Sequence, residues 1–131
     1  MILVDTSCWI EYFHPRGNAR VKERLSAEIR NGTVATCGAV LCELFRGVSI
    51  DEAVRLRVVF SGLQNIPTLE EDWAAIQDLA LRLKAEGFQP PILDMLVAVV
   101  SGRSGATLWH FGDQHFRMIQ KVLRIKAEDL G

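Results

Sequence analysis

Four acidic residues lie in or beside apolar segments of this 131-residue chain, where a carboxylate is not expected by default. Asp5 directly follows three consecutive aliphatic residues, and Asp113 follows a second apolar segment late in the chain. Glu43 and Asp94 lie inside apolar segments. Carboxylates gathered in one cleft repel one another and raise each other's pKa. A divalent cation such as Mg²⁺ or Mn²⁺ removes that repulsion, activates water and screens a phosphate. The pattern therefore predicts metal-assisted hydrolysis of a phosphodiester.

Each of these acids also has a structural interpretation of its own. Asp5 and Asp94 lie where helices are expected to start, and an aspartate there accepts backbone N–H bonds worth ~1 kcal/mol. Asp113 follows Gly112 and fits a turn. Glu43 can still face water, because a helix rotates by ~100° per residue. These interpretations explain the acids one by one, whereas a metal site explains them together, and the residues alone leave both open.

Apolar periodicity and turn residues divide the chain into alternating strands and helices. Strands are expected at 1–4, 33–37 and 106–112, with weaker candidates at 66–69 and 122–125. Helices are expected at 6–13, 21–32, 39–47, 51–62, 69–86 and 92–105. This alternation predicts an α/β fold with a largely parallel sheet and helices on both of its faces.

The segment 69–86 gives the clearest helix pattern. Thr68 and Glu71 have the spacing of a capping box. Five apolar residues then follow at helical spacing and are expected to form one buried stripe: Leu69, Trp73, Ile76, Leu79 and Leu83.

The predicted sheet gives the acids a common location. In open α/β sheets, ligands bind beyond the carboxyl ends of the strands. Asp5 ends the first strand, and Asp113 follows the strand at 106–112. We therefore expect these two acids to meet at one edge of the sheet, close to Asp94 and Glu43.

Composition limits the class of protein. Hydrophobic residues make up 49% and charged residues 24%, which predicts a single globular domain over residues 1–131. The net charge of -1 gives no overall basic field, although a local basic patch can still bind nucleic acid. The three cysteines lack CxxC spacing, which favours free thiols in a reducing compartment. With no apolar stretch long enough for a membrane span, we expect a cytoplasmic protein without a membrane partner.

Four segments, in this order, resemble the PIN-domain ribonucleases, and in particular the VapC toxins of bacterial toxin–antitoxin pairs: ILVDTSCWIEYF, CELFRG, LDMLVAVVSGRSGATL and GDQHFRMI. The resemblance covers nearly the whole chain. It implies a Rossmann-like, three-layer α/β/α sandwich and a Mg²⁺- or Mn²⁺-dependent endoribonuclease. The family's catalytic and metal-binding acids fall on Asp5, Glu43, Asp94 and Asp113, and Thr6 matches the hydroxyl residue that helps to orient the first acid.

The resemblance also implies partners. The expected substrates are structured RNAs such as tRNA or ribosomal RNA loops. The expected protein partners are a second copy in a homodimer and a VapB-type antitoxin, which inserts a segment into the acidic cleft in a larger assembly. One departure concerns the family pattern D-x-D-F, in which His115 replaces the second aspartate. We expect His115 to pack as an ordinary surface histidine, with softening of the negative charge as the alternative.

The expected mechanism uses three aspartates to hold the ion, while Glu43 either ligates it or acts as general base for the attacking water. The products are a 5′-phosphate and a 3′-hydroxyl. Arg46, one turn beyond Glu43, is the first candidate for binding RNA, and Arg16, Arg20 and Lys22 are the next.

Two other classes compete with this interpretation. A receiver-like signalling domain also binds Mg²⁺ through clustered acids, but it requires an acidic pair after the first strand, where this chain has Asp5-Thr6-Ser7. A non-catalytic α/β binding module, with acids that only cap helices, is the other. Titration with Mg²⁺ or Mn²⁺ separates the binding module from the enzyme.

Overall fold

One five-stranded sheet forms the centre of the molecule. The computed structural model describes all residues from Met1 to Gly131. Every pair of neighbouring strands is parallel, and the strand order is β3-β2-β1-β4-β5. The strands are β1 (Ile2–Val4), β2 (Val34–Cys37), β3 (Gln64–Ile66), β4 (Thr107–His110) and β5 (Lys126–Asp129).

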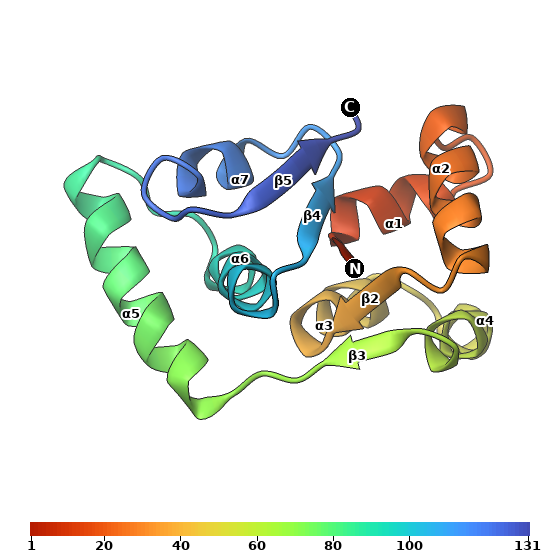
Figure 1. Ribbon diagram of the computed structural model, residues 1–131. Helices are drawn as coiled ribbons and strands as arrows, with labels where there is room; N and C mark the ends of the chain where they lie inside the picture. The colour runs from red at the N-terminus through yellow and green to blue at the C-terminus, as the bar shows by residue number, and fades with distance from the viewer.

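Helices cover both faces of this sheet. β4 lies between α6 on one side and α1 on the other, and α5 packs on the outer side of α6 (Figure 1). The predicted α/β sandwich is thus confirmed, and no helix has the length and apolarity to cross a membrane. The helices are α1 (Thr6–Phe13), α2 (Ala19–Arg30), α3 (Gly38–Arg46), α4 (Ile50–Ser61), α5 (Glu70–Ala85), α6 (Ile92–Ser104) and α7 (Gln114–Ile119).

The core is built around α6 and the central strands. All residues of α6 from Asp94 to Ser101 are buried. In β1, Leu3 and Val4 are fully buried, as expected for a parallel strand covered on both faces. Burial of each large aliphatic side chain contributes ~1.5–3 kcal/mol. This packing fixes the ends of β1 and β4 and the first turn of α6, which position Asp5, Asp113 and Asp94.

The strand order changes direction between β1 and β4. From β1 the chain runs to β2 and β3 on one side of the sheet, and it later adds β4 and β5 on the other side. The carboxyl ends of β1 and β4 are therefore adjacent at the point where the direction of winding changes. Open α/β sheets bind their ligands at such a point.

The start of α5 differs from the prediction. The helix begins at Glu70, and its N-cap is Leu69 rather than Thr68. The backbone N–H of Leu69 donates to Asp72 Oδ2 at 2.8 Å. Arg103, at the end of α6, also donates to Asp72, with Nε 2.8 Å from Oδ1. The predicted capping box of Thr68 and Glu71 is therefore wrong, because Asp72 both caps α5 and ties it to α6.

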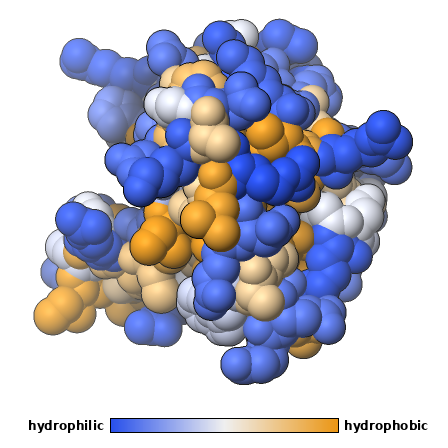
Figure 2. Space-filling view, turned by 90° about the vertical axis from the view of Figure 1, so that its left-hand side faces the viewer, coloured by the Kyte–Doolittle hydropathy of each residue, from blue (hydrophilic) through white to orange (hydrophobic).

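The predicted stripe of α5 is confirmed only in part. Ile76, Leu79 and Leu83 are buried, whereas Leu69 is 38% and Trp73 47% exposed. α5 has a packing partner on one side only, so only a narrow face is covered. Figure 2 views the molecule from the α5 side and shows apolar side chains set among hydrophilic ones.

Three further elements depart from the sequence expectations. β3 begins at Gln64, two residues before the predicted 66–69. The last strand starts at Lys126, after the predicted 122–125, whose apolar residues pack on the core from a turn instead. α7 was not predicted, since it has only six residues and follows a turn at Gly112.

Candidate active site

Asp5 lies at the carboxyl end of β1 and is also the N-cap of α1. Its Oδ2 accepts hydrogen bonds from the Ser7 backbone N–H at 3.0 Å and the Ser7 hydroxyl at 2.6 Å. Ser7 Oγ in turn accepts from the Phe111 N–H at 3.0 Å, which ties this turn to the end of β4. Asp5 Oδ1 is buried and has no hydrogen-bond partner. Asp5 therefore caps the helix with one oxygen and keeps the other free.

The environment of Asp5 disfavours its charge. Burial raises the pKa of Asp5, the charge of Asp113 adds to this effect, and the hydrogen bonds from Ser7 oppose it. The residue is only 2% exposed. A buried carboxylate oxygen without a donor is costly unless a cation or a donor compensates it.

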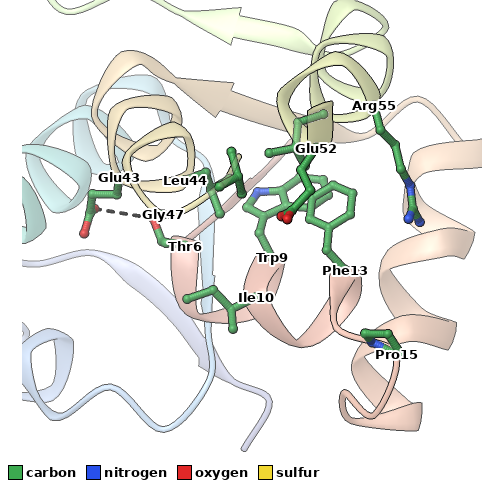
Figure 3. A pocket seen from close by; sticks show the side chains of 12 residues that line it. Thr6, Trp9, Ile10, Phe13, Pro15, Glu43, Leu44, Gly47, Glu52 and Arg55 are labelled. Atoms are coloured by element: carbon green, nitrogen blue, oxygen red, sulfur yellow. Dashed lines mark hydrogen bonds between the residues drawn. The ribbon is translucent and has the colours of Figure 1, made fainter. Parts of the chain in front are cut away.

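Glu43 lies on α3 and is half-buried. The Thr6 hydroxyl donates to Glu43 Oε1 at 3.4 Å, shown as the dashed line in Figure 3. Burial raises the pKa of Glu43, and the charges of Asp5 and Asp94 raise it further. Glu43 therefore faces the other acids, and Thr6 contacts it rather than Asp5.

Asp94 lies in the first turn of α6, three positions after the N-cap Pro91. It does not cap the helix, so the expectation that Asp94 serves as an N-cap is wrong. Its side chain is 9% exposed, and Oδ2 lies 2.8 Å from His115 Nδ1. Burial raises the pKa of Asp94 to about 6, with further increases from Asp113 and Asp5 and a smaller opposing effect of His115.

Asp113 is the N-cap of α7 and accepts from the His115 backbone N–H at 2.8 Å. Its own backbone N–H donates to His110 Nδ1 at 3.2 Å. The preceding Gly112 has φ 64°, a conformation that L side chains adopt with strain. The positive φ redirects the chain after β4, so that Asp113 reaches the carboxyl end of β1.

The end of the chain holds this turn in place. Asp129, the last residue of β5, accepts from the Gly112 N–H at 2.7 Å and from the Gly131 N–H at 2.9 Å. Arg117 of α7 pairs with the other oxygen of Asp129. Burial acts to raise the pKa of Asp129, but the hydrogen bonds from Arg117, Gly112 and Gly131 outweigh it and lower the pKa to about 2. Asp129 is therefore ionised and fixes the loop that carries Asp113.

The four predicted acids come together in two overlapping groups. Potential ligand atoms of Asp5, Glu43 and Asp94 lie within 4.8 Å of one another, as do those of Asp94, Asp113 and His115. Asp94 belongs to both groups. The expectation that His115 packs as an ordinary surface histidine is wrong, because its ring also lies 3.3 Å from Asp113 Oδ1.

These residues fit a hard divalent cation. Their donors are mostly carboxylate oxygens, which Mg²⁺ and Mn²⁺ prefer. Burial, and to a lesser extent mutual repulsion, raises the pKa of Asp5, Glu43 and Asp94. The buried Asp5 Oδ1 has no partner in the protein, so it is available to an ion.

None of the predicted RNA-binding residues forms an ion pair with these acids. Arg46, Arg16 and Arg20 are all exposed. Lys22 is engaged elsewhere, since its ammonium donates to the Tyr12 carbonyl at 2.9 Å. None of the four lines the groove that opens beside Glu43.

That groove has a volume of about 590 Å³ and lies between α1, α3 and α4. Glu43 and Thr6 lie at one end, Trp9 and Phe13 along its length, and Arg55 near the other end (Figure 3). The groove is thus mainly apolar, with Glu43 at one end, Arg55 near the other and Glu52 also in its lining.

Sequence reasoning did not single out Ser7, His110, Asp129 or Arg55. Ser7 follows Asp5 and Thr6 as a second hydroxyl, which was the only signal for its role. The contacts of Asp129 and His110 arise from the sheet order, and the sequence contains no motif for them.

Comparison with known proteins agrees with this fold. The PIN domain matches residues 2–122. The chain therefore belongs to the PIN-domain family. It is 30% identical over 132 residues to "VapC ribonuclease Mb1587" of Mycobacterium bovis and to "Ribonuclease VapC11" of Mycobacterium tuberculosis, with 97% of this chain and 97% of each relative covered. Within the PIN-domain family, this likeness places the chain with the VapC ribonucleases.

Solved structures agree on the fold. VapBC2 from Rickettsia felis, bound to a DNA fragment from its promoter, matches with a TM-score of 0.81 and 21% identity over 100% of both chains. FitAcB from Neisseria gonorrhoeae matches with a TM-score of 0.78 and 20% identity, over 98% of this chain and 97% of that chain. The receiver-domain alternative is ruled out by the family match.

Proposed function

We propose that this chain is a Mg²⁺- or Mn²⁺-dependent endoribonuclease that acts as the toxin of a VapBC pair, built as one PIN domain over residues 1–131. The observation that supports the metal dependence is that Asp5, Glu43, Asp94 and Asp113 gather in two groups that share Asp94, together with a buried Asp5 oxygen that has no protein partner. Cleavage leaves a 5′-phosphate and a 3′-hydroxyl.

Each acid has a defined part in this mechanism. Asp5, Asp94 and Asp113 hold the ion, directly or through water. When bound, the ion supplies positive charge against the phosphate and lowers the pKa of the attacking water. Ser7 fixes the orientation of Asp5 through two hydrogen bonds.

Glu43 is the candidate general base. Its pKa is raised by burial and by the charges of Asp5 and Asp94, which favours proton uptake from water. Thr6 donates to one oxygen of Glu43 and leaves the other oxygen available. Glu43 therefore either takes the proton or adds an oxygen ligand to the ion.

The substrate is proposed to be structured RNA, with tRNA and ribosomal RNA loops as the favoured classes. Carboxylates repel phosphates, so basic side chains at the rim must bind the RNA backbone. Arg46 lies on the same helix as Glu43 and remains the first candidate, while Arg55 at the far end of the groove is added by the structure.

The proposed protein partner is a VapB-type antitoxin. One structural neighbour, VapBC2 from Rickettsia felis, is bound to a DNA fragment from its promoter. In this chain, the apolar groove between α1, α3 and α4 leads to Glu43, which suits an apolar peptide segment that ends in a cation. An arginine there pairs bidentately with carboxylates and competes with the ion. We also propose that the chain forms a homodimer.

Cleavage of RNA by the purified protein in Mn²⁺ tests the enzyme. Asp5→Asn and Asp94→Asn should each abolish cleavage, because each removes a charged ligand. Asp78→Asn is the matched control, since Asp78 is an exposed acid of α5 outside the cluster. Equal cleavage by wild type, Asp5→Asn and Asp94→Asn would discard the mechanism.

The non-catalytic binding module remains the second candidate, because Asp5 and Asp113 do cap α1 and α7. Titration with Mn²⁺ separates the two functions. A module with only capping acids binds no ion, and its titration is the same for wild type and Asp94→Asn.

A further inference from the structure

The imidazole of His115 lies against two of the acids. Its Nδ1 is 2.8 Å from Asp94 Oδ2 and 3.3 Å from Asp113 Oδ1. The backbone N–H of His115 donates to Asp113 at 2.8 Å, so both the ring and the main chain are fixed on this side of the cleft. His115 is 44% exposed at its side chain, while Nδ1 faces the acids.

These separations match those between ligands of one metal ion. Metal–nitrogen and metal–oxygen bonds are roughly 2.0–2.2 Å, so neighbouring ligand atoms at right angles lie about 3 Å apart. The distances from Nδ1 to the two carboxylates fall on either side of that value. An ion can thus take the place of the contacts between the three side chains with little movement.

A second observation points to a cation in the same cleft. Asp5 is 2% exposed, and its Oδ1 is buried without a donor. Asp5 shares Asp94 as a neighbour with the group that contains His115. The charges of Asp5 and Asp113 also act on each other. The group of Asp94, Asp113 and His115 therefore shares Asp94 with the group that contains Asp5, whose Oδ1 lacks a partner.

Other parts of the molecule support no comparable proposal. The pair of Arg103 and Asp72 is satisfied between α5 and α6. Cys8 and Cys37 are buried in the core, where they have no access to a reactant. The apolar side chains on the α5 face have no feature beside them that selects an occupant.

We propose that His115 is a nitrogen ligand of the ion held by Asp94 and Asp113, and that it makes this site favour Mn²⁺ over Mg²⁺. The inference rests on the proposed metal dependence and deepens it. Imidazole nitrogen suits the transition metals, whereas Mg²⁺ prefers a shell of oxygen ligands. A neutral imidazole also adds a ligand without adding to the negative charge of three carboxylates.

Pulsed electron paramagnetic resonance of Mn²⁺ bound to the full chain tests the ligand directly. A coordinated imidazole gives nitrogen-14 modulation of the Mn²⁺ echo. Wild type should show this modulation, and His115→Asp, which keeps a ligand but replaces nitrogen by oxygen, should lose it. His14→Gln is the control, because His14 is an exposed histidine outside the cluster and its loss should leave the signal unchanged.

Binding titrations with Mn²⁺ alone and Mg²⁺ alone add a second readout. His115→Ala should weaken Mn²⁺ binding by roughly 10- to 100-fold. His115→Asp should bind both ions with a smaller preference for Mn²⁺ than wild type has.

The outcomes distinguish the two proposals. If Mn²⁺ binds but the wild type shows no nitrogen modulation, His115 is not a ligand and the inference fails, while the metal-dependent mechanism stands. Modulation that persists in His115→Asp also overturns it. If no Mn²⁺ binds to the wild type, the proposed metal dependence fails and the inference fails with it.

Discussion

Replacement of Asp94 by asparagine should stabilise the metal-free protein, although it removes a proposed metal ligand. Burial, together with the charges of Asp113 and Asp5, raises the pKa of Asp94 to about 6 from an ordinary value of 3.8. Ionisation of Asp94 therefore destabilises the folded protein relative to the unfolded chain. Asparagine has nearly the same shape and carries no charge, so it avoids that destabilisation.

The magnitude follows from the two pKa values. At ~1.36 kcal/mol per pKa unit, the ionised Asp94 lowers the free energy of unfolding by ~3 kcal/mol at pH 7. Between pH 3.8 and about 6, the folded state keeps a proton that the unfolded chain has released. Stability from this group is thus present at low pH, falls as the pH rises through that window, and stays low above it.

Urea unfolding in EDTA measures the effect. We expect Asp94→Asn to raise the free energy of unfolding by up to ~3 kcal/mol at pH 7.5, and by about half as much at pH 5. Asp78→Asn, which removes an exposed carboxylate of α5, should change it by less than ~0.5 kcal/mol.

Addition of Mn²⁺ should make the wild type more stable than Asp94→Asn. An ion that binds only the folded state stabilises it, so the wild type should gain stability while Asp94→Asn gains much less. Two results would refute the reasoning: an Asp94→Asn protein that is no more stable than wild type in EDTA at pH 7.5, or one that gains as much from Mn²⁺ as wild type does.

Three further predictions concern the supports of the site. Asp129→Asn should weaken Mn²⁺ binding by roughly 10-fold in calorimetric titration, because Asp129 holds the Gly112 turn that positions Asp113. The control Glu128→Gln, one residue away, should leave the affinity unchanged. Gly112→Ala should destabilise the fold by ~1 kcal/mol in urea, since φ is 64°, and a value near zero would contradict the assigned conformation. Asp72→Asn should cost ~1–3 kcal/mol of unfolding free energy, because it weakens the bonds from Arg103; unchanged stability would show that this pair contributes nothing.

The acids could be predicted from sequence because each interrupts an apolar pattern. Asp5 follows a buried strand directly, and parallel strands bring their carboxyl ends to one edge. Glu43 was singled out by its apolar neighbours on a short helix. Asp5 satisfies its structural interpretation as well, because it caps α1 with one oxygen, and Asp113 lies at the predicted turn and also caps α7. One aspartate can therefore both cap a helix and belong to the acidic cluster.

The remaining contacts depend on tertiary structure that no local pattern encodes. His115 meets Asp94 although 21 positions separate them, and the ring could equally have faced water from the short helix α7. β5 has the polar sequence KAED, so the apolar residues before it were the better strand candidate. The contact of Asp129 with Gly112 depends on the pairing of β5 with β4, which only the complete sheet defines.

The attachment of the chain end to the Gly112 turn matters for how the protein is handled in the laboratory. The Leu130 N–H donates to the His110 carbonyl at 2.8 Å, and Gly131 follows at once beside Gly112. An affinity tag fused after Gly131 starts next to Asp113, and a polyhistidine tag there brings competing imidazoles to the cleft. A tag before Met1 leaves from the amino ends of the strands, at the opposite edge of the sheet (Figure 1). Purification through an amino-terminal tag, removed before any metal is added, keeps the measured ion affinities those of the protein itself.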